Sequence, residues 1–165
     1  IVMDTMNFWM DVALDDLKVV VKKVDVLLVN DGEARQLSGE VSLVKAAKAI
    51  MAMGPKYLII KKGEHGALLF HENSVFFAPA LPLEEVFDPT GAGDTFAGGF
   101  TGYLAKVKDI SFDSMKTAII VGSAMASFCV EKFGPERLKE INADDITARI
   151  NEFVQLVNFD IDLIG

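Results

Sequence analysis

The sequence predicts an α/β protein with helices on both faces of a β-sheet, and two observations lead to that fold class. The runs at 24–30 and 56–62 are short, β-rich and almost continuously apolar, as in strands that are covered on both sides. Stretches with the apolar spacing of helices lie between and after these runs. This order of strands and helices favours a sheet enclosed by helical layers.

The N-terminal elements follow from periodicity and from helix stop signals. Apolar residues from Met10 to Val21 recur at the spacing of one helix face, and Gly54 with Pro55 marks the end of another helix. The elements expected here, in order, are a strand at 1–4, a helix at 9–23, a strand at 24–30, a short helix at 33–37, a helix capped by Ser42, and a strand at 56–62.

The C-terminal elements begin with a hairpin. The runs GALLFH and SVFFAP flank the tripeptide ENS, which predicts two antiparallel strands. Three helices are then expected near 93–106, 113–131 and 143–157. Cys129 is the only cysteine and is expected to be buried in the second of these helices, so no internal disulfide or multi-cysteine metal site can form.

Composition limits the partners that the protein can have. The net charge of −8 argues against nucleic acid as a main partner, because a phosphate backbone requires an excess of Lys and Arg. The apolar run at 118–130 is shorter than the roughly 20 residues that span a bilayer, and no signal segment opens the chain. We therefore expect a cytoplasmic protein with no membrane partner. The chain opens on a strand-like run without an initiator methionine, which favours a fragment that begins inside a fold.

The stretch FDPTGAGDTFAGGF at 87–100 carries the strongest chemical signal. Pro89 fixes its own φ and pushes Asp88 into an extended conformation. Thr90 then leads into a turn whose backbone amides can point at one spot, and a helix is expected to begin near Asp94. A glycine turn that enters a helix N-terminus is an anion site. The residues of this turn are Gly91, Ala92 and Gly93.

An aspartate beside an anion site needs a reason, because two negative charges repel. Asp94 fits if its carboxylate accepts the proton of an attacking hydroxyl while the amides hold a transferred phosphoryl group. The structural alternative is that Asp94 only interacts favourably with the helix dipole. Gly98, Gly99 and Gly102 would each weaken a purely structural helix by roughly 1 kcal/mol, so we expect this helix to approach a sheet or a ligand closely.

Two further polar loops follow buried strands. Asn30 and Glu33 are oxygen ligands suited to Mg²⁺, directly or through its water, although Asn30 would serve equally well as a helix cap. Lys61 precedes a turn that Gly63 and Gly66 open, and its ammonium group could meet phosphate or remain solvated. Strand ends of a parallel sheet line a ligand crevice, so the three loops are expected to converge.

These motifs together resemble the C-terminal half of a ribokinase-like, PfkB-type carbohydrate or nucleoside kinase. The resemblance covers nearly all of residues 1–165 and is most specific in DPTGAGDTFAGGF. It implies a ribokinase-like three-layer αβα sandwich, of which this chain is the ATP-binding and catalytic portion. The first half of the family's chain, with its β-sheet lid and most acceptor contacts, is absent.

The resemblance also implies roles for individual residues. Asp94 would be the catalytic base, and the amides of Gly91, Ala92 and Gly93 the anion hole. Asn30 and Glu33 match an N-x-x-E motif that organises Mg²⁺ and phosphates. The implied ATP contacts are Asn30, Lys61, Gly63, Gly66 and Thr90.

The resemblance implies cofactors and partners as well. ATP and Mg²⁺ are expected, with K⁺ as a further cation beside Asp88 and the segment 129–136, which also corresponds to the adenine pocket. The acceptor would be the hydroxymethyl group of a sugar or a nucleoside. Family dimers usually form through the absent lid, so a homodimer is an expectation that this chain alone does not carry.

Two other classes of function compete with the kinase. A non-catalytic nucleotide-binding regulatory module would share the fold, but an intact set of Asp94, Asn30 and Glu33 argues against a decayed site. A dinucleotide-dependent oxidoreductase is disfavoured, because no G-x-G-x-x-G lies between the first strand and the first helix.

Overall fold

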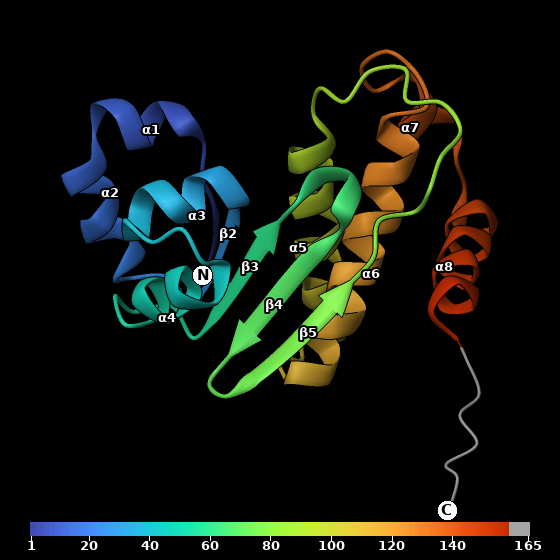
Figure 1. Ribbon diagram of the computed structural model, residues 1–165. Helices are drawn as coiled ribbons and strands as arrows, with labels where there is room; N and C mark the ends of the chain where they lie inside the picture. Colours follow the sequence, from blue (N-terminus) through green and yellow to red (C-terminus); the bar gives the residue numbers. More distant parts are fainter. Residues whose placement is uncertain (159–165) are drawn as a thin grey trace, which may run out of the picture.

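A computed structural model of the chain describes residues 1–158 and shows one five-stranded sheet between two helical layers (Figure 1). The strands lie side by side in chain order, β1 to β5. The first three run parallel, and the last two are antiparallel to their neighbours. Their bounds are β1 Val2–Asp4, β2 Val26–Asn30, β3 Tyr57–Lys61, β4 Ala67–His71 and β5 Ser74–Ala78.

Four helices cover one face of the sheet, and two long helices cover the other (Figure 1). The first layer consists of α1 Asn7–Val12, α2 Leu14–Val21, α3 Asp31–Ser38 and α4 Leu43–Met51. The second consists of α5 Ala92–Val107 and α6 Phe112–Cys129. The remaining elements are the 3₁₀ turn η1 Gly63–His65, α7 Glu136–Glu140 and α8 Ala143–Val157, and α8 packs on α6.

The alternating side chains of the central strands divide the core into two parts. Leu27 and Val29 of β2 face the layer of α1 to α4, whereas Val26 and Leu28 face α5 and α6. Because both faces of β2 and β3 are buried, their sequences are almost continuously apolar. The predicted three-layer α/β architecture is confirmed.

Several predicted elements differ in detail. The helix expected at 9–23 is two helices, because the chain leaves helical geometry at Ala13, where φ is −147° and ψ is 39°. Ser42 occupies the N-cap of α4, but its side chain makes no capping hydrogen bond. The short helix α7 was not expected. The hairpin, the three long C-terminal helices and the burial of Cys129 in α6 agree with the sequence prediction.

None of the helices within residues 1–158 combines the length and the apolarity needed to cross a bilayer.

A close approach of two helices fixes the position of α5. A Cβ built on Gly122 of α6 would lie 2.8 Å from the carbonyl oxygen of Phe96, and one built on Gly99 would lie 3.1 Å from the Cα of Gly122. The first distance is shorter than real Cβ contacts, and the second is tighter than most of them, so glycine at 99 and 122 lets the two backbones meet.

This contact differs from the approach to the sheet that was one explanation expected for the glycines of α5. Of Gly98, Gly99 and Gly102, Gly99 is the one with a close neighbour among residues 1–158, and that neighbour is α6 rather than the sheet. A Cβ at Gly98 or Gly102 would meet no atom of residues 1–158 within 4 Å. Close packing within the described residues therefore does not explain Gly98 or Gly102.

Substitution by alanine should change the free energy of unfolding in opposite directions at a glycine in the helix contact and at a glycine that faces open space. Gly122→Ala should lower the free energy of unfolding by about 1–3 kcal/mol, because the new methyl group overpacks against the backbone of Phe96. Gly98→Ala should raise it by about 0.5–1 kcal/mol, because alanine favours a helix and meets open space. Urea unfolding of both variants measures the difference, and equal effects of the two substitutions would contradict this account of the α5–α6 contact.

Candidate functional site

Three polar side chains stand at the carboxyl ends of the three parallel strands. Asp4 ends β1, Asn30 ends β2 and Lys61 ends β3. Asn30 and Lys61 are direct partners in the strand register. This edge of the sheet is where ligands bind in open α/β folds.

Asn30 and Glu33 form a reciprocal cap at the start of α3. The Asn30 Oδ1 accepts from the Glu33 amide at 2.8 Å, and the Glu33 Oε2 accepts from the Asn30 amide at 2.9 Å. The hydroxyl of Thr5 donates to the same Oε2 at 2.8 Å. Glu33 is only 3% exposed, so this buried carboxylate joins the end of β1, the end of β2 and the start of α3. The capping role that the sequence left open for Asn30 is therefore observed.

Lys61 lies between β1 and the glycine loop. Its Nζ contacts the two carboxylate oxygens of Asp4 at 2.8 and 2.5 Å. A Cβ built on Gly93 would lie 3.4 Å from the same Nζ. The structure thus brings Lys61 to the N-terminus of α5, and two of the three predicted loops converge there.

The glycine loop forms the entry to α5. Gly91 is the N-cap in the left-handed region, with φ of 82°, which favours glycine. The Ala92 amide donates to the carbonyl oxygen of Pro89 at 3.2 Å, whereas the amides of Gly91 and Gly93 have no backbone acceptor within residues 1–158. Of the three amides predicted to form an anion hole, the Ala92 amide is therefore engaged inside the loop. Asp94 lies in the first turn of α5 and is exposed.

Asp88 belongs to a neighbouring group of contacts. The Thr90 amide donates to its Oδ1 at 2.9 Å, and its own amide donates to the carbonyl oxygen of Val130 at 3.3 Å. Hydrogen bonds from the amide and hydroxyl of Thr90, and from the amide of Gly134, hold the pKa of Asp88 below its ordinary value. Within residues 1–158 no hydrogen bond joins Asp88 to Asn30 or Glu33, and no three His, Cys, Asp or Glu side chains form a metal-binding cluster.

The predicted turn after β3 requires its glycines. Gly63 and Gly66 have φ values of 57° and 81°. A Cβ on Gly66 would lie 2.1 Å from the carbonyl oxygen of Ala78, so any side chain there would collide with the end of β5. The turn is therefore held tightly against the sheet at the place where the pocket begins.

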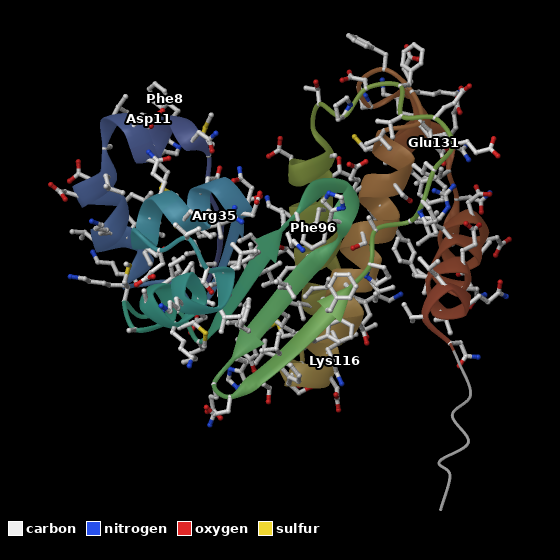
Figure 2. The ribbon with its side chains drawn as sticks, viewed as in Figure 1. Phe8, Asp11, Arg35, Phe96, Lys116 and Glu131 are labelled. Atoms are coloured by element: carbon white, nitrogen blue, oxygen red, sulfur yellow. The ribbon has the colours of Figure 1, made fainter. Side chains whose placement is uncertain are left out.

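A pocket of about 760 Å³ lies between this turn, the segment that leads from β5 to α5, and the second half of α6. Its size is within the range of small-molecule sites. Phe96, labelled in Figure 2, forms part of the wall where α5 meets the sheet. The residues that line it are Lys61, Gly63, Glu64, His65, Gly66, Ala67, Ala80, Leu81, Pro82, Leu83, Val86, Pro89, Ala92, Gly93, Phe96, Ser123, Ala126, Ser127 and Val130.

Helix α8 supports one wall of this pocket. Arg149 donates to the Ser127 Oγ at 2.7 Å and to the Glu131 Oε1 at 2.6 Å, and its guanidinium carbon lies 4.0 Å from the ring centre of Phe128. Arg137 binds the other oxygen of Glu131 at 2.8 Å. Glu131 therefore ties α8 and α7 to the end of α6 (Figure 2).

Sequence reasoning did not single out Asp4, Thr5 or Arg149. Asp4 ends the first apolar run, and a polar residue at a strand end was the signal that identified Asn30 and Lys61. The sequence carries no comparable signal for Arg149, which lies in an ordinary amphipathic helix.

A sheet between two helical layers, with a glycine loop that enters a helix at the carboxyl ends of the parallel strands, defines a class of α/β proteins that bind phosphorylated ligands at that edge. Residues 3–141 match the model of the pfkB family of carbohydrate kinases. The chain belongs to this family, and the resemblance recognised in its motifs is confirmed.

Relatives in this family include sugar and nucleoside kinases. The chain is 40% identical over 92 residues to the cytidine kinase of Thermococcus kodakarensis, an alignment that covers 54% of this chain and 33% of that protein. It is 31% identical over 128 residues to the ribokinase of Staphylococcus aureus, covering 72% of this chain and 40% of that protein.

Solved structures share the fold. The aminoimidazole riboside kinase of Salmonella enterica, in complex with aminoimidazole riboside and an ATP analogue, superposes with a TM-score of 0.78 and 25% identity, over 90% of this chain and 51% of that one. The nucleoside kinase of Methanocaldococcus jannaschii gives a TM-score of 0.72 at 23% identity, over 92% of this chain and 48% of that one. The fold is therefore ribokinase-like, and the chain spans about half the length of these structures.

The ion pairs of Glu131 should make stability depend on pH. Burial acts to raise the pKa of Glu131, but hydrogen bonds and charges from Arg149 and Arg137 outweigh it and hold the pKa below its ordinary value. The stabilisation is therefore complete above the unfolded pKa of about 4.3 and is lost as pH falls through the lower folded value. Glu131→Gln should reduce stability by about 1–3 kcal/mol at pH 7 and weaken its decline below about pH 5.

Urea unfolding at a series of pH values measures this effect. Glu152→Gln is the matched control, because Glu152 lies 3.6 Å from the same Arg149 but is half exposed, and its profile should follow the wild type. If the free energy of unfolding of Glu131→Gln fell below pH 5 as steeply as that of the wild type, the Glu131 carboxylate would not stabilise the fold.

Proposed function

We propose that the chain is the ATP-binding and catalytic portion of a kinase that transfers the terminal phosphoryl group of ATP to the hydroxymethyl group of a sugar or nucleoside. The observation that carries this proposal is the exposed Asp94 in the first turn of α5, which directly follows the amides of Gly91 and Gly93. Gly93 lines the pocket, and Asp94 is the next residue, outside the lining found within residues 1–158. The names of the relatives support the acceptor class.

The described residues fit ATP. The pocket has the volume for a nucleoside, and its walls are mostly apolar, with Leu81, Val86 and Val130 available to a base. The phosphates would lie toward Lys61 and the N-terminus of α5, where the Gly91 and Gly93 amides can donate to their oxygens. Gly63 and Gly66 shape the turn after β3, and Thr90 belongs to the loop that enters α5, so these residues would lie on the two sides of the phosphates.

In this proposal Asp94 accepts the proton of the acceptor hydroxyl as that oxygen attacks the terminal phosphorus of ATP, and the bond from this phosphorus to the bridging oxygen breaks, so that ADP leaves. The Gly91 and Gly93 amides stabilise the charge that develops on the phosphoryl oxygens. Lys61 neutralises part of the negative charge of the phosphates. The exposure of Asp94 leaves room for an acceptor supplied by another part of the protein.

In this proposal Asn30, Glu33 and Asp88 are the residues that hold metal ions. The structure gives the carboxylate of Glu33 two hydrogen bonds, both on Oε2, which leaves Oε1 able to orient water around Mg²⁺. Mg²⁺ would neutralise phosphate charge and orient the phosphates of ATP. A monovalent cation such as K⁺ would be held beside Asp88, whose backbone meets the end of α6 at Val130.

Asp94→Asn in the full-length protein should lower kcat by about 10²–10⁴-fold while ATP binding changes little, because the amide cannot accept the proton. The measurement is a steady-state assay across sugars and nucleosides, with ATP affinity determined by calorimetry. Asp113→Asn is the matched control, since Asp113 is the acidic residue in the first turn of α6 and its loss changes a helix-dipole interaction and an exposed ion pair with Lys116. Retained turnover in Asp94→Asn would refute the base and favour a non-catalytic nucleotide-binding module.

Glu33→Gln should raise the Mg²⁺ concentration needed for half-maximal activity by about tenfold or more. The glutamine oxygen can still accept from Thr5 and Asn30, so the cap survives while the charge is lost. Asp31→Asn is the control, because Asp31 is also in the first turn of α3 but binds Arg35. An unchanged Mg²⁺ titration would remove Glu33 from the metal network.

A further inference from the structure

The ion pair between Asp4 and Lys61 spans the carboxyl ends of β1 and β3, across β2. Its two contacts are 2.8 and 2.5 Å, and the side chains of Asp4 and Lys61 are only 22% and 17% exposed. The Lys56–Asp25 pair lies by contrast near the opposite ends of β2 and β3, with side chains 65% and 44% exposed. The Asp4–Lys61 pair is thus the shielded one, and it borders the pocket.

The geometry leaves the lysine able to act on a further anion. An ammonium group has three N–H donors, and two of them face the two oxygens of Asp4. Lys61 also lines the pocket, and its Nζ lies beside Gly93 at the N-terminus of α5. One N–H therefore remains for an oxygen held at the amides of that helix.

From this geometry we infer that Asp4 is a positioning residue for phosphate binding, which fixes the Lys61 ammonium group where the pocket meets the N-terminus of α5. A lysine side chain has four rotatable bonds, and a bidentate carboxylate restricts it to one arrangement before the ligand arrives. The inference rests on the proposed function, because it takes the anion to be a phosphate of ATP.

The same carboxylate connects the lysine to the start of α3. The Asp4 Oδ1 also accepts from the Thr5 amide at 2.9 Å, and the Thr5 hydroxyl binds Glu33. Residues 4 and 5 therefore orient both the cation that would meet the phosphates and the carboxylate that would organise Mg²⁺. A surface ion pair that served stability alone would not need this placement.

The test compares Asp4→Asn, Lys61→Met and the double variant in the full-length protein. Calorimetric titration with ATP and with ADP should give Kd values raised about tenfold or more for each single variant, and KM for ATP should rise in parallel while KM for the acceptor stays within about twofold. The double variant should be no weaker than Lys61→Met alone, because Asp4→Asn keeps the Oδ1 that accepts from the Thr5 amide and therefore alters ATP binding through the lysine.

Two controls separate positioning from structure. Lys56→Met removes the exposed Lys56–Asp25 pair near the opposite ends of β2 and β3 and should leave ATP affinity unchanged. The charge reversal Asp4→Lys with Lys61→Asp should recover the thermal stability that the single reversals lose, yet it should not recover ATP binding, because the cation then lies on β1.

The outcomes are distinct. If Asp4→Asn lowers the unfolding temperature while its Kd for ATP stays within twofold of the wild type, the pair is structural and the inference is overturned. If the wild-type protein phosphorylates no sugar or nucleoside but binds ATP, the proposed function fails while the titrations still decide the role of Asp4. If the wild type binds no ATP, both fail.

Discussion

The contact between Gly122 of α6 and the backbone of Phe96 in α5 is the constraint on which the candidate site depends. Because neither Gly99 nor Gly122 has a side chain, the two helices pack backbone to backbone and α5 takes a fixed place over the sheet. Its N-terminus then lies against Lys61 at the end of β3. The amides that we propose for phosphate binding are in this way set by helix packing at some distance from the loop that carries them.

The carboxyl edge of the sheet uses few side chains for several tasks. Glu33 closes the cap of α3 and binds Thr5, and Asp4 holds Lys61. Such groups contribute to folding and are proposed to contribute to ligand binding, so the two properties are coupled at this edge. Asp94 is different, because it is exposed and packing does not determine its role.

Patterns within single segments predicted much of this structure, and contacts between segments were the part that they could not supply. The unbroken apolar runs of β2 and β3 identified buried strands, and DPTGAGD identified the helix entry, because in both cases the signal is local. The break at Ala13 has no Gly or Pro to mark it in the sequence, and the pairing of Asp4 with Lys61 joins residues 57 positions apart. The glycines of α5 were recognised as unusual, but the neighbour of Gly99 was in another helix.

The position of Arg149 in α8 affects the choice of a C-terminal boundary for a shortened version of this protein. The match to the family ends at residue 141, before α8 begins. A version cut there would lose the guanidinium group that stacks on Phe128 and neutralises Glu131. The hydroxyl of Ser127, in the pocket wall, would lose its donor as well. A domain boundary taken from the family match alone would therefore remove a structural support of the pocket.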